Sequence, residues 1–155
     1  MRLYFDCCCY NRPFDDQSQD RIHDESEAIL SIMKRCHQNP DYTVLGSTIL
    51  DMEFAKITDT NKKDKITSLA KIISETVTYT QAIQKRAIEI QKVESIRKMD
   101  SLHIASAESG HADVFLSTDD KLLKACRRMQ DQLKVDVKNP IYYLAEVNEH
   151  DGCES

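Results

Sequence analysis

Short apolar runs alternate with one-sided helical patterns along the 155-residue chain. The short runs are rich in aromatic and β-branched residues and end at polar ones, which is typical of buried strands. They cover residues 2–5, 42–45, 114–117 and 134–137, and residues 76–79 are a further brief extended piece. We therefore expect a sheet built from short strands.

Between the short runs, apolar residues recur every three or four positions and mark one face of a helix. This spacing predicts helices over residues 19–36, 47–57, 65–74, 80–90, 98–109, 120–129 and 140–147. Ser47 and Thr80 are suited to cap two of these helices, and Gly110 is suited to end another in the left-handed conformation. Residues 11–16 predict a loop. Strands that alternate with helices predict a central parallel sheet with helices on both faces, which is a three-layer α/β/α sandwich.

The composition agrees with one compact, helix-rich domain. The chain is 41% hydrophobic and 30% charged, with only 3 Gly and 3 Pro. It is too apolar for a disordered chain and too poor in turn residues for a β-sandwich. We expect the domain to cover residues 1–147 and an acidic tail to follow at residues 148–155.

The six cysteines are predicted to be reduced and mostly buried. Cys7, Cys8 and Cys9 follow the first strand directly, and neighbouring residues of a strand point to opposite faces, so one ion cannot bind all three thiols. Asp6 interrupts the amino-terminal apolar run, which argues against a signal peptide. No segment approaches the roughly 18 apolar residues of a membrane helix. We expect a cytoplasmic protein with no membrane partner.

Carboxylates occur where α/β sheets bind their ligands, beyond the carboxyl ends of the strands. Asp6 follows the first strand, and Asp119 follows the strand at 114–117. Glu53 lies early in the helix after the second strand, and Asp100 opens a later helix. Each acid alone is explained as a helix cap, a partner of the helix dipole or a solvated side chain. Four converging carboxylates repel one another, and Mg²⁺ or Mn²⁺, which prefer oxygen ligands and support phosphodiester cleavage, would neutralise them.

These acids lie in segments that resemble the PIN domain family. The most specific match runs from Asp100 to Leu123, in the sequence DSLHIASAESGHADVFLSTDDKLL. Weaker matches surround Asp6 and the motif Ser47-x-x-Leu50-x-x-Glu53, and the resemblance continues to the Asn139-Pro140-Ile141 segment. It therefore extends over nearly the whole chain.

The resemblance implies a PIN-like α/β/α fold and a ribonuclease that hydrolyses phosphodiester bonds in RNA with Mg²⁺ or Mn²⁺. Single-domain bacterial members are often VapC-type toxins, so the resemblance also implies an RNA substrate and an antitoxin protein as partner. The sequence does not fix the oligomeric state, and a homodimer is among the states that it allows.

Carried over residue by residue, the acids that bind metal and catalyse correspond to Asp6, Glu53, Asp100 and Asp119. Asp120 is an alternative fourth acid, but Asp119 matches the family's spacing of two residues after Ser117 and Asp120 does not. Ser117 matches a hydroxyl that orients the ligands, and Cys7 stands where the family usually has Thr, Ser or Asn. The Cys7 thiol is a weaker hydrogen-bond donor than those groups. Asn11 and Arg12 are expected either to contact RNA or to form the turn.

Several alternatives remain open. His103 either packs in the core or donates to a neighbouring carboxylate, and Tyr142 and Tyr143 either pack in the last helix or stack on RNA. A PIN-like module that binds nucleic acid or protein without cutting is the main alternative to an enzyme. A receiver-like phosphoacceptor would use Lys138, but the acids do not occur in the order that it requires.

The charge is divided along the chain. The net charge of −5 argues against binding of nucleic acid by bulk charge, but residues 61–138 hold 15 basic and 11 acidic groups, a net +4. This basic middle is where we expect phosphate contacts, from among Lys62, Lys63, Lys65, Lys85, Arg86, Arg97, Lys98, Arg127 and Arg128.

Overall fold

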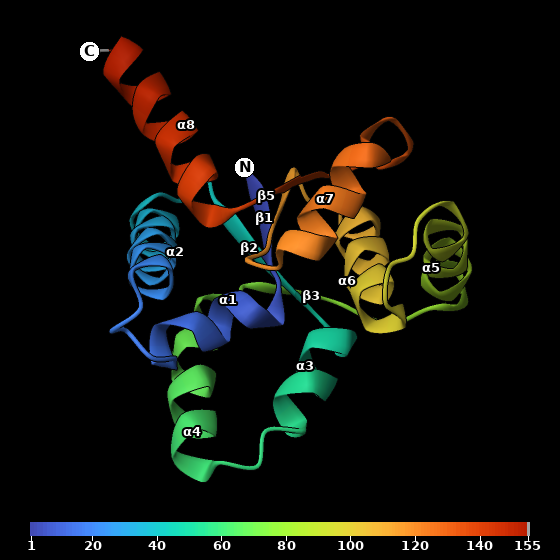
Figure 1. Ribbon diagram of the computed structural model, residues 1–155, viewed down its shortest axis with the longest axis horizontal. Coiled ribbons are helices and arrows are strands. Elements are labelled where there is room, and N and C mark those ends of the chain that lie inside the picture. Colours follow the sequence, from blue (N-terminus) through green and yellow to red (C-terminus); the bar gives the residue numbers. More distant parts are fainter. Residues whose placement is uncertain (155) are drawn as a thin grey trace.

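The computed structural model describes residues 1–154, and the side chains of residues 1–151. All strand pairs are parallel and belong to one sheet, whose members are β1 (Arg2–Phe5), β2 (Thr43–Ser47), β3 (Glu75–Val77), β4 (Val114–Leu116) and β5 (Asp136–Lys138). Their order is β3-β2-β1-β4-β5, so β1 lies at the centre (Figure 1). The extended piece predicted near residue 76 is thus the edge strand β3.

The helices are α1 (Cys7–Asn11), α2 (Asp20–Gln38), α3 (Thr48–Ala55), α4 (Thr60–Leu69), α5 (Gln81–Val93), α6 (Lys98–Ser109), α7 (Asp120–Arg128) and α8 (Pro140–Glu154). Short 3-10 turns occur at η1 (Arg12–Phe14), η2 (Ala70–Ile72) and η3 (Gln130–Gln132). The predicted caps are confirmed, because the Ser47 and Thr80 hydroxyls accept hydrogen bonds from the first turns of α3 and α5.

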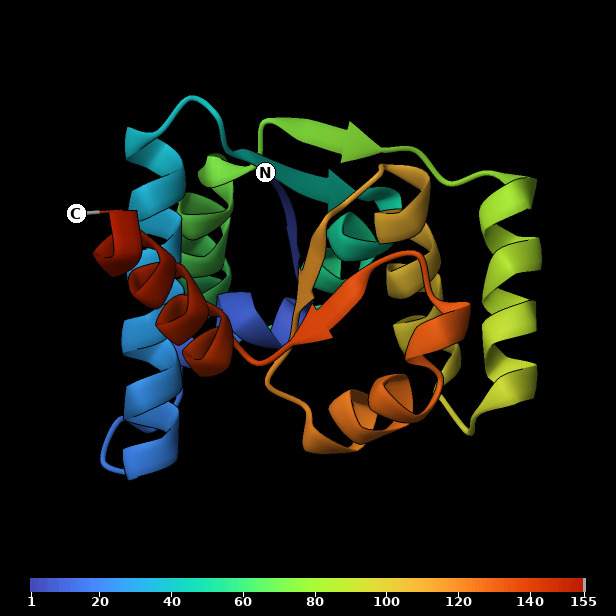
Figure 2. The ribbon, with the colours of Figure 1, turned by 90° about the horizontal axis from the view of Figure 1, so that it is seen from above.

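Successive side chains of the strands point to opposite faces, so each central strand contributes to two cores. On one face Tyr4 stacks on Phe115, with ring centroids 5.2 Å apart, and this core continues into α5, α6 and α7. On the other face Leu3 and Phe5 pack against α1, α2, α4 and α8. Figure 2 shows the two helical layers on either side of the sheet. The predicted α/β/α sandwich with a central parallel sheet is confirmed.

The segment after β1 is helical, which corrects two expectations. Cys7, Cys8 and Cys9 begin α1 and do not continue the strand, and the predicted loop at residues 11–16 contains η1. The Asp6 carboxylate caps α1 by accepting the Cys7 backbone N–H at 2.8 Å, a local signal that outweighs the short apolar run. The five cysteines whose side chains the structure describes are all free, as predicted.

One helix begins at another residue than predicted, and one helix ends at the predicted residue with another backbone conformation. Helix α4 begins at Thr60 and not at residue 65, because Asp59 caps it and its polar first turns carry no apolar stripe. Gly110 has a φ of −83°, and His111 takes the positive φ of 59°. Gly110 is required for close packing instead, since an added Cβ would lie 2.6 Å from the side chain of Val77.

Helix α8 continues past residue 147, where the sequence predicted its end. Arg35 of α2 donates to the Asn148 side chain at 2.9 Å and pairs with Asp151, so the last turns dock on α2. The expected boundary between residues 147 and 148 therefore falls inside a continuous helix. Within residues 1–154, no helix is long and apolar enough to cross a membrane.

Candidate metal centre

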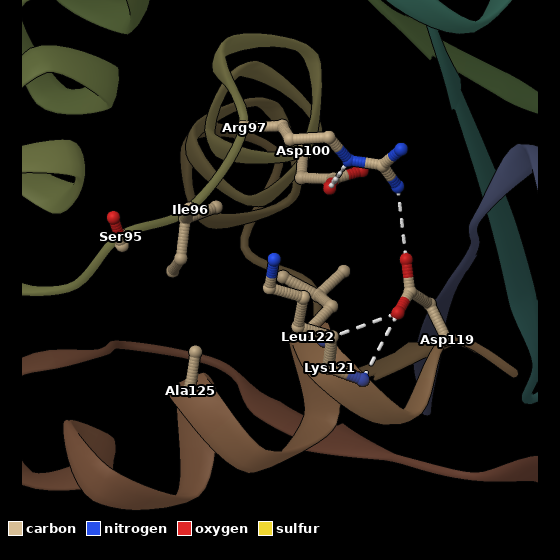
Figure 3. Close-up of a pocket in the computed structure, with 8 residues that line it drawn as sticks. All are labelled: Ser95, Ile96, Arg97, Asp100, Asp119, Lys121, Leu122 and Ala125. Carbon is tan, nitrogen blue, oxygen red and sulfur yellow. Dashed lines mark hydrogen bonds and ion pairs between the residues drawn. The ribbon is translucent and has the colours of Figure 1, made fainter.

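The four predicted acids come from four different elements that meet at the carboxyl edge of the sheet. Asp6 joins β1 to α1, Glu53 lies in α3, Asp100 lies in the first turn of α6 and Asp119 caps α7. Asp100 and Asp119 line one pocket of about 180 Å³, drawn in Figure 3, where they face each other. Asp100 and Asp119, which lie far apart in the sequence, thus meet at one pocket.

Asp6 is buried and held by hydrogen bonds on both carboxylate oxygens. Its Oδ1 accepts the Cys7 backbone N–H at 2.8 Å, and its Oδ2 accepts the Ser117 hydroxyl at 3.0 Å. Ser117 therefore lies where the sequence expected it. The thiol that reaches Asp6 belongs to Cys8, whose Sγ lies 3.4 Å from Oδ2, while Cys7 contributes its backbone. The sequence analysis missed Cys8 because the resemblance pointed to the residue directly after Asp6, which is Cys7.

Glu53 is held by a buried chain of hydrogen bonds that passes through His103. The Leu50 backbone N–H donates to the Ser47 hydroxyl. The Tyr4 hydroxyl oxygen lies 2.6 Å from the Ser47 hydroxyl oxygen and 2.6 Å from His103 Nδ1. On the other side of the ring, Nε2 bonds to Glu53 Oε1. The ring of His103 therefore links Tyr4 to Glu53, with one ring nitrogen bonded to each. Both open alternatives for His103 therefore hold, since it is buried and bonded to a carboxylate.

Arg97 joins the other two acids, whereas the sequence analysis named it only among the candidate phosphate contacts. Its Nε donates to Asp100 Oδ2 at 3.0 Å, and its Nη2 donates to Asp119 Oδ2 at 2.9 Å (Figure 3). Asp119 Oδ1 accepts the backbone N–H groups of Lys121 and Leu122, so one carboxylate caps α7 and faces the pocket. The Arg97 side chain is 77% exposed, which leaves the guanidinium at the mouth of the pocket.

The charges of the acids act on one another. Burial raises the pKa of Asp100, and the nearby charge of Asp6 and, more weakly, that of Asp119 raise it further, although Arg97 opposes them. The hydrogen bond from His103 lowers the pKa of Glu53 against the effect of burial. Carboxylates that are close enough to perturb one another in this way favour a bound cation.

The residues present fit a hard divalent cation. Ligand atoms of Asp6, Glu53 and His103 all lie within 4.8 Å of one another. Because both ring nitrogens of His103 are hydrogen-bonded to Tyr4 and Glu53, the carboxylate oxygens are the atoms left to ligate. Oxygen ligands suit Mg²⁺ and Mn²⁺.

The remaining candidates lie beside this centre and make internal contacts. Asp120 accepts two hydrogen bonds from Arg21, at 2.7 and 2.8 Å, and does not line the pocket of Figure 3. The Asn11 side chain donates to the Cys7 carbonyl at 2.9 Å, and Arg12 donates to the Thr118 hydroxyl at 2.9 Å. Asn11 and Arg12 thus connect α1 and η1 to the site, and their contact with RNA stays a prediction.

Comparison with known proteins gives a likeness in structure. No family model and no curated protein sequence matches the chain. A chain of VapBC2 from Rickettsia felis, bound to a DNA fragment from its promoter, is 14% identical with a TM-score of 0.55, over 90% of this chain and 98% of that chain. A chain of a toxin–antitoxin complex from Klebsiella pneumoniae is 14% identical with a TM-score of 0.56, over 89% and 97%. A chain of VapBC-1 from nontypeable Haemophilus influenzae is 15% identical with a TM-score of 0.56, over 90% and 98%.

The sheet order, the two helical layers and these likenesses define the class of fold. The chain is a PIN-like α/β/α sandwich, as its sequence resemblance implied. It shares this fold with chains of VapBC toxin–antitoxin complexes.

Proposed function

We propose that this protein is a Mg²⁺- or Mn²⁺-dependent endoribonuclease of VapC type, the toxin of a toxin–antitoxin pair that acts in the cytoplasm. The observation that carries the proposal is the convergence of four carboxylates from β1, α3, α6 and α7 at one edge of a PIN-like sheet, namely Asp6, Glu53, Asp100 and Asp119. Titratable groups whose pKa values are shifted by burial and by one another's charge cluster at functional sites, and Asp100 is such a group.

The ion, when bound, activates water and stabilises the charge that develops on the scissile phosphate. The carboxylates of the four acids would hold it. Ser117 and the Cys7 N–H fix the Asp6 carboxylate, and the chain through Tyr4 and His103 fixes Glu53. Ligands that are oriented in advance by such outer contacts bind a metal more tightly.

The same proposal gives the partners. The substrate is RNA, and an antitoxin protein is the partner, a proposal supported by the similar chain in a toxin–antitoxin complex from Klebsiella pneumoniae. A homodimer is a further expectation that the molar mass in solution tests. A PIN-like module that only binds would not need to take up metal, so calorimetric titration with Mn²⁺ separates the two functions.

The test compares Asp100→Asn and Asp119→Asn with the wild-type protein. Asn keeps the shape of each side chain and is itself a good helix cap, so α7 is expected to stay folded. Loss of one anionic ligand should lower Mn²⁺-dependent cleavage of single-stranded RNA by at least about 100-fold. Asp131→Asn, an exposed acid in η3, is the matched control and should cleave RNA like the wild type.

Circular dichroism checks that each variant keeps its fold. Cleavage by folded Asp100→Asn and Asp119→Asn proteins at the wild-type rate would refute the assignment of the acids. Wild-type protein that binds Mn²⁺ and cuts no RNA would refute the ribonuclease and leave a metal-binding module.

A further inference from the structure

A second hollow lies on the far side of α7 from the acidic pocket. It has a volume of about 330 Å³ and is bordered by α7, the end of β5 and the start of α8. In Figure 2 the arrow of β5 ends between these two helices. The residues that matter to its chemistry are Asp120, Lys124, Arg127, Lys138 and Tyr142.

Tyr142 is the most exposed of the large hydrophobic side chains that the structure describes, at 70%. The next residue, Tyr143, is 3% exposed and packs in the core, which answers the question that the sequence left open for this pair. Tyr142 therefore does not contribute to the packing of α8. It presents an aromatic face to solvent at the border of the hollow.

The charges around Tyr142 leave a positive surplus. The acids near the hollow are already paired, Asp120 with Arg21 at 2.7 Å and Glu146 with Lys138 at 2.6 Å. Lys124 and Arg127 are exposed, and Arg127 makes no hydrogen bond or ion pair with any side chain in the part of the chain that the structure describes. The charge of Lys124 also acts on Asp120, but Arg21, Lys124, Arg127 and Lys138 still exceed Asp120 and Glu146 by two positive charges.

The spacing along α7 connects the hollow to the metal centre. Asp120, Lys124 and Arg127 lie on one face of the helix and border the hollow. Asp119, Leu122 and Ala125 lie on another face and line the acidic pocket. A strand that crosses the amino terminus of α7 would therefore pass from the acids into the hollow.

We propose that this hollow, the α7–α8 groove, binds the single-stranded RNA chain next to the cleavage point. One base stacks on Tyr142, and the flanking phosphates contact Lys124 and Arg127. Aromatic faces combined with a positive groove are the means by which proteins hold single strands without reading their sequence. The proposal rests on the ribonuclease function above and names where its substrate lies.

Charge favours RNA over a second copy of this chain as the occupant. In a two-fold dimer the same patch meets itself, so Lys124 and Arg127 would lie near their own counterparts. Like charges in such a position oppose association, whereas phosphates neutralise them.

The experiment measures binding of a fluorescein-labelled single-stranded RNA of about 12 nucleotides by anisotropy, in EDTA so that no cleavage occurs. Tyr142→Ala should weaken binding by about 5- to 100-fold, while Tyr142→Phe, which keeps the stacking face, should bind like the wild type. Arg127→Gln should weaken binding. It should also reduce the slope of log affinity against log salt concentration by about the amount that one phosphate contact contributes. Arg128→Gln is the matched control. Arg128 is the residue after Arg127, and its side chain is paired with Glu94 at 3.1 Å.

Equal affinity of Tyr142→Ala and wild type, or equal effects of Arg127→Gln and Arg128→Gln, would overturn the proposal. A change of molar mass in Tyr142→Ala, without a change in RNA affinity, would assign the groove to a second copy instead. Cleavage with Mn²⁺ is run in parallel on the wild type. If RNA is cut and these variants bind normally, only the groove is refuted; if RNA is neither cut nor bound, the ribonuclease function is refuted as well.

Discussion

Arg97 neutralises Asp100 and Asp119, so a divalent metal held by these two acids would compete with it. The guanidinium lies 3.0 Å from Asp100 and 2.9 Å from Asp119. Replacing Arg97 by Gln removes this competing charge and leaves a shorter, neutral polar side chain. We therefore expect Arg97→Gln to bind Mn²⁺ more tightly than the wild type.

The size of the effect follows from the exposure of the ion pairs. The Arg97 side chain is 77% exposed and that of Asp119 is 30% exposed, so solvent screens both pairs. Pairs of this kind contribute about 0.2–1 kcal/mol each, and two of them correspond to about a 2- to 30-fold change in the dissociation constant. Loss of the repulsion between the guanidinium and the bound dication acts in the same direction.

The assay is calorimetric titration of apo protein with Mn²⁺ at low ionic strength. Lys98→Gln is the matched control, since Lys98 is the next residue and is exposed but lies outside the pocket. It should bind Mn²⁺ like the wild type. A dissociation constant for Arg97→Gln equal to or above that of the wild type would refute the competition. Absence of Mn²⁺ binding in every protein would refute the metal centre itself.

Three further substitutions test how the site and the fold are held. Tyr4→Phe leaves the buried His103 Nδ1 without its hydrogen-bond partner and should destabilise the fold by about 1–3 kcal/mol in urea unfolding, whereas Tyr10→Phe removes a buried hydroxyl without a partner among the described side chains and should not. Glu25→Ala leaves the guanidinium of Arg12 without its buried partner and should cost about 2–4 kcal/mol, measured against the exposed Glu27→Ala.

The third concerns alkaline pH: burial raises the pKa of Cys126 to about 12. The unfolded thiol ionises near pH 8.5, so the folded state loses stability as the pH rises above that value. Between about pH 8 and pH 10, the Tm of Cys126→Ala should fall less than the Tm of the wild type, whatever the two values are at neutral pH. An equal fall in both proteins would show that the Cys126 thiol is not the cause.

The core layers could be predicted because they depend on local periodicity. Leu3, Tyr4 and Phe5 alternate between the two faces of the sheet, and the apolar stripe of α2 specifies a helix buried on one side. The errors occurred where a polar residue decided the local structure. Asp6 starts a helix directly after β1, and Asp59 starts α4 ahead of its first apolar residue. A capping carboxylate carries no periodic signal, so hydrophobic spacing overlooks it.

The acids of the site could be predicted for a different reason. Asp6 and Asp119 follow strands, and in a parallel sheet all such positions lie on one edge. Residues that arrive from helices follow no such rule, and Glu53 and Asp100 were assigned through the resemblance to the PIN domain family. Arg97 precedes α6 by one position and reaches Asp119 across the pocket, and His103 reaches Glu53 across 50 positions of sequence. Only the packing of α6 against α3 and α7 brings these side chains to the acids.

In helix α7 the spacing of apolar residues identifies the buried face of the helix. It gives no information on which parts of the protein lie next to the polar faces. Its apolar residues Leu122 and Cys126 lie in the core beside Tyr4 and Phe115. The polar positions on one side of that stripe meet the metal centre through Asp119, and those on the other meet the groove through Arg127. Substitutions on the two sides are therefore expected to separate in kinetics. Loss of the Asp119 charge should lower kcat, and loss of the Arg127 charge should raise KM while kcat is kept, because only the first contact strengthens as charge develops in the transition state.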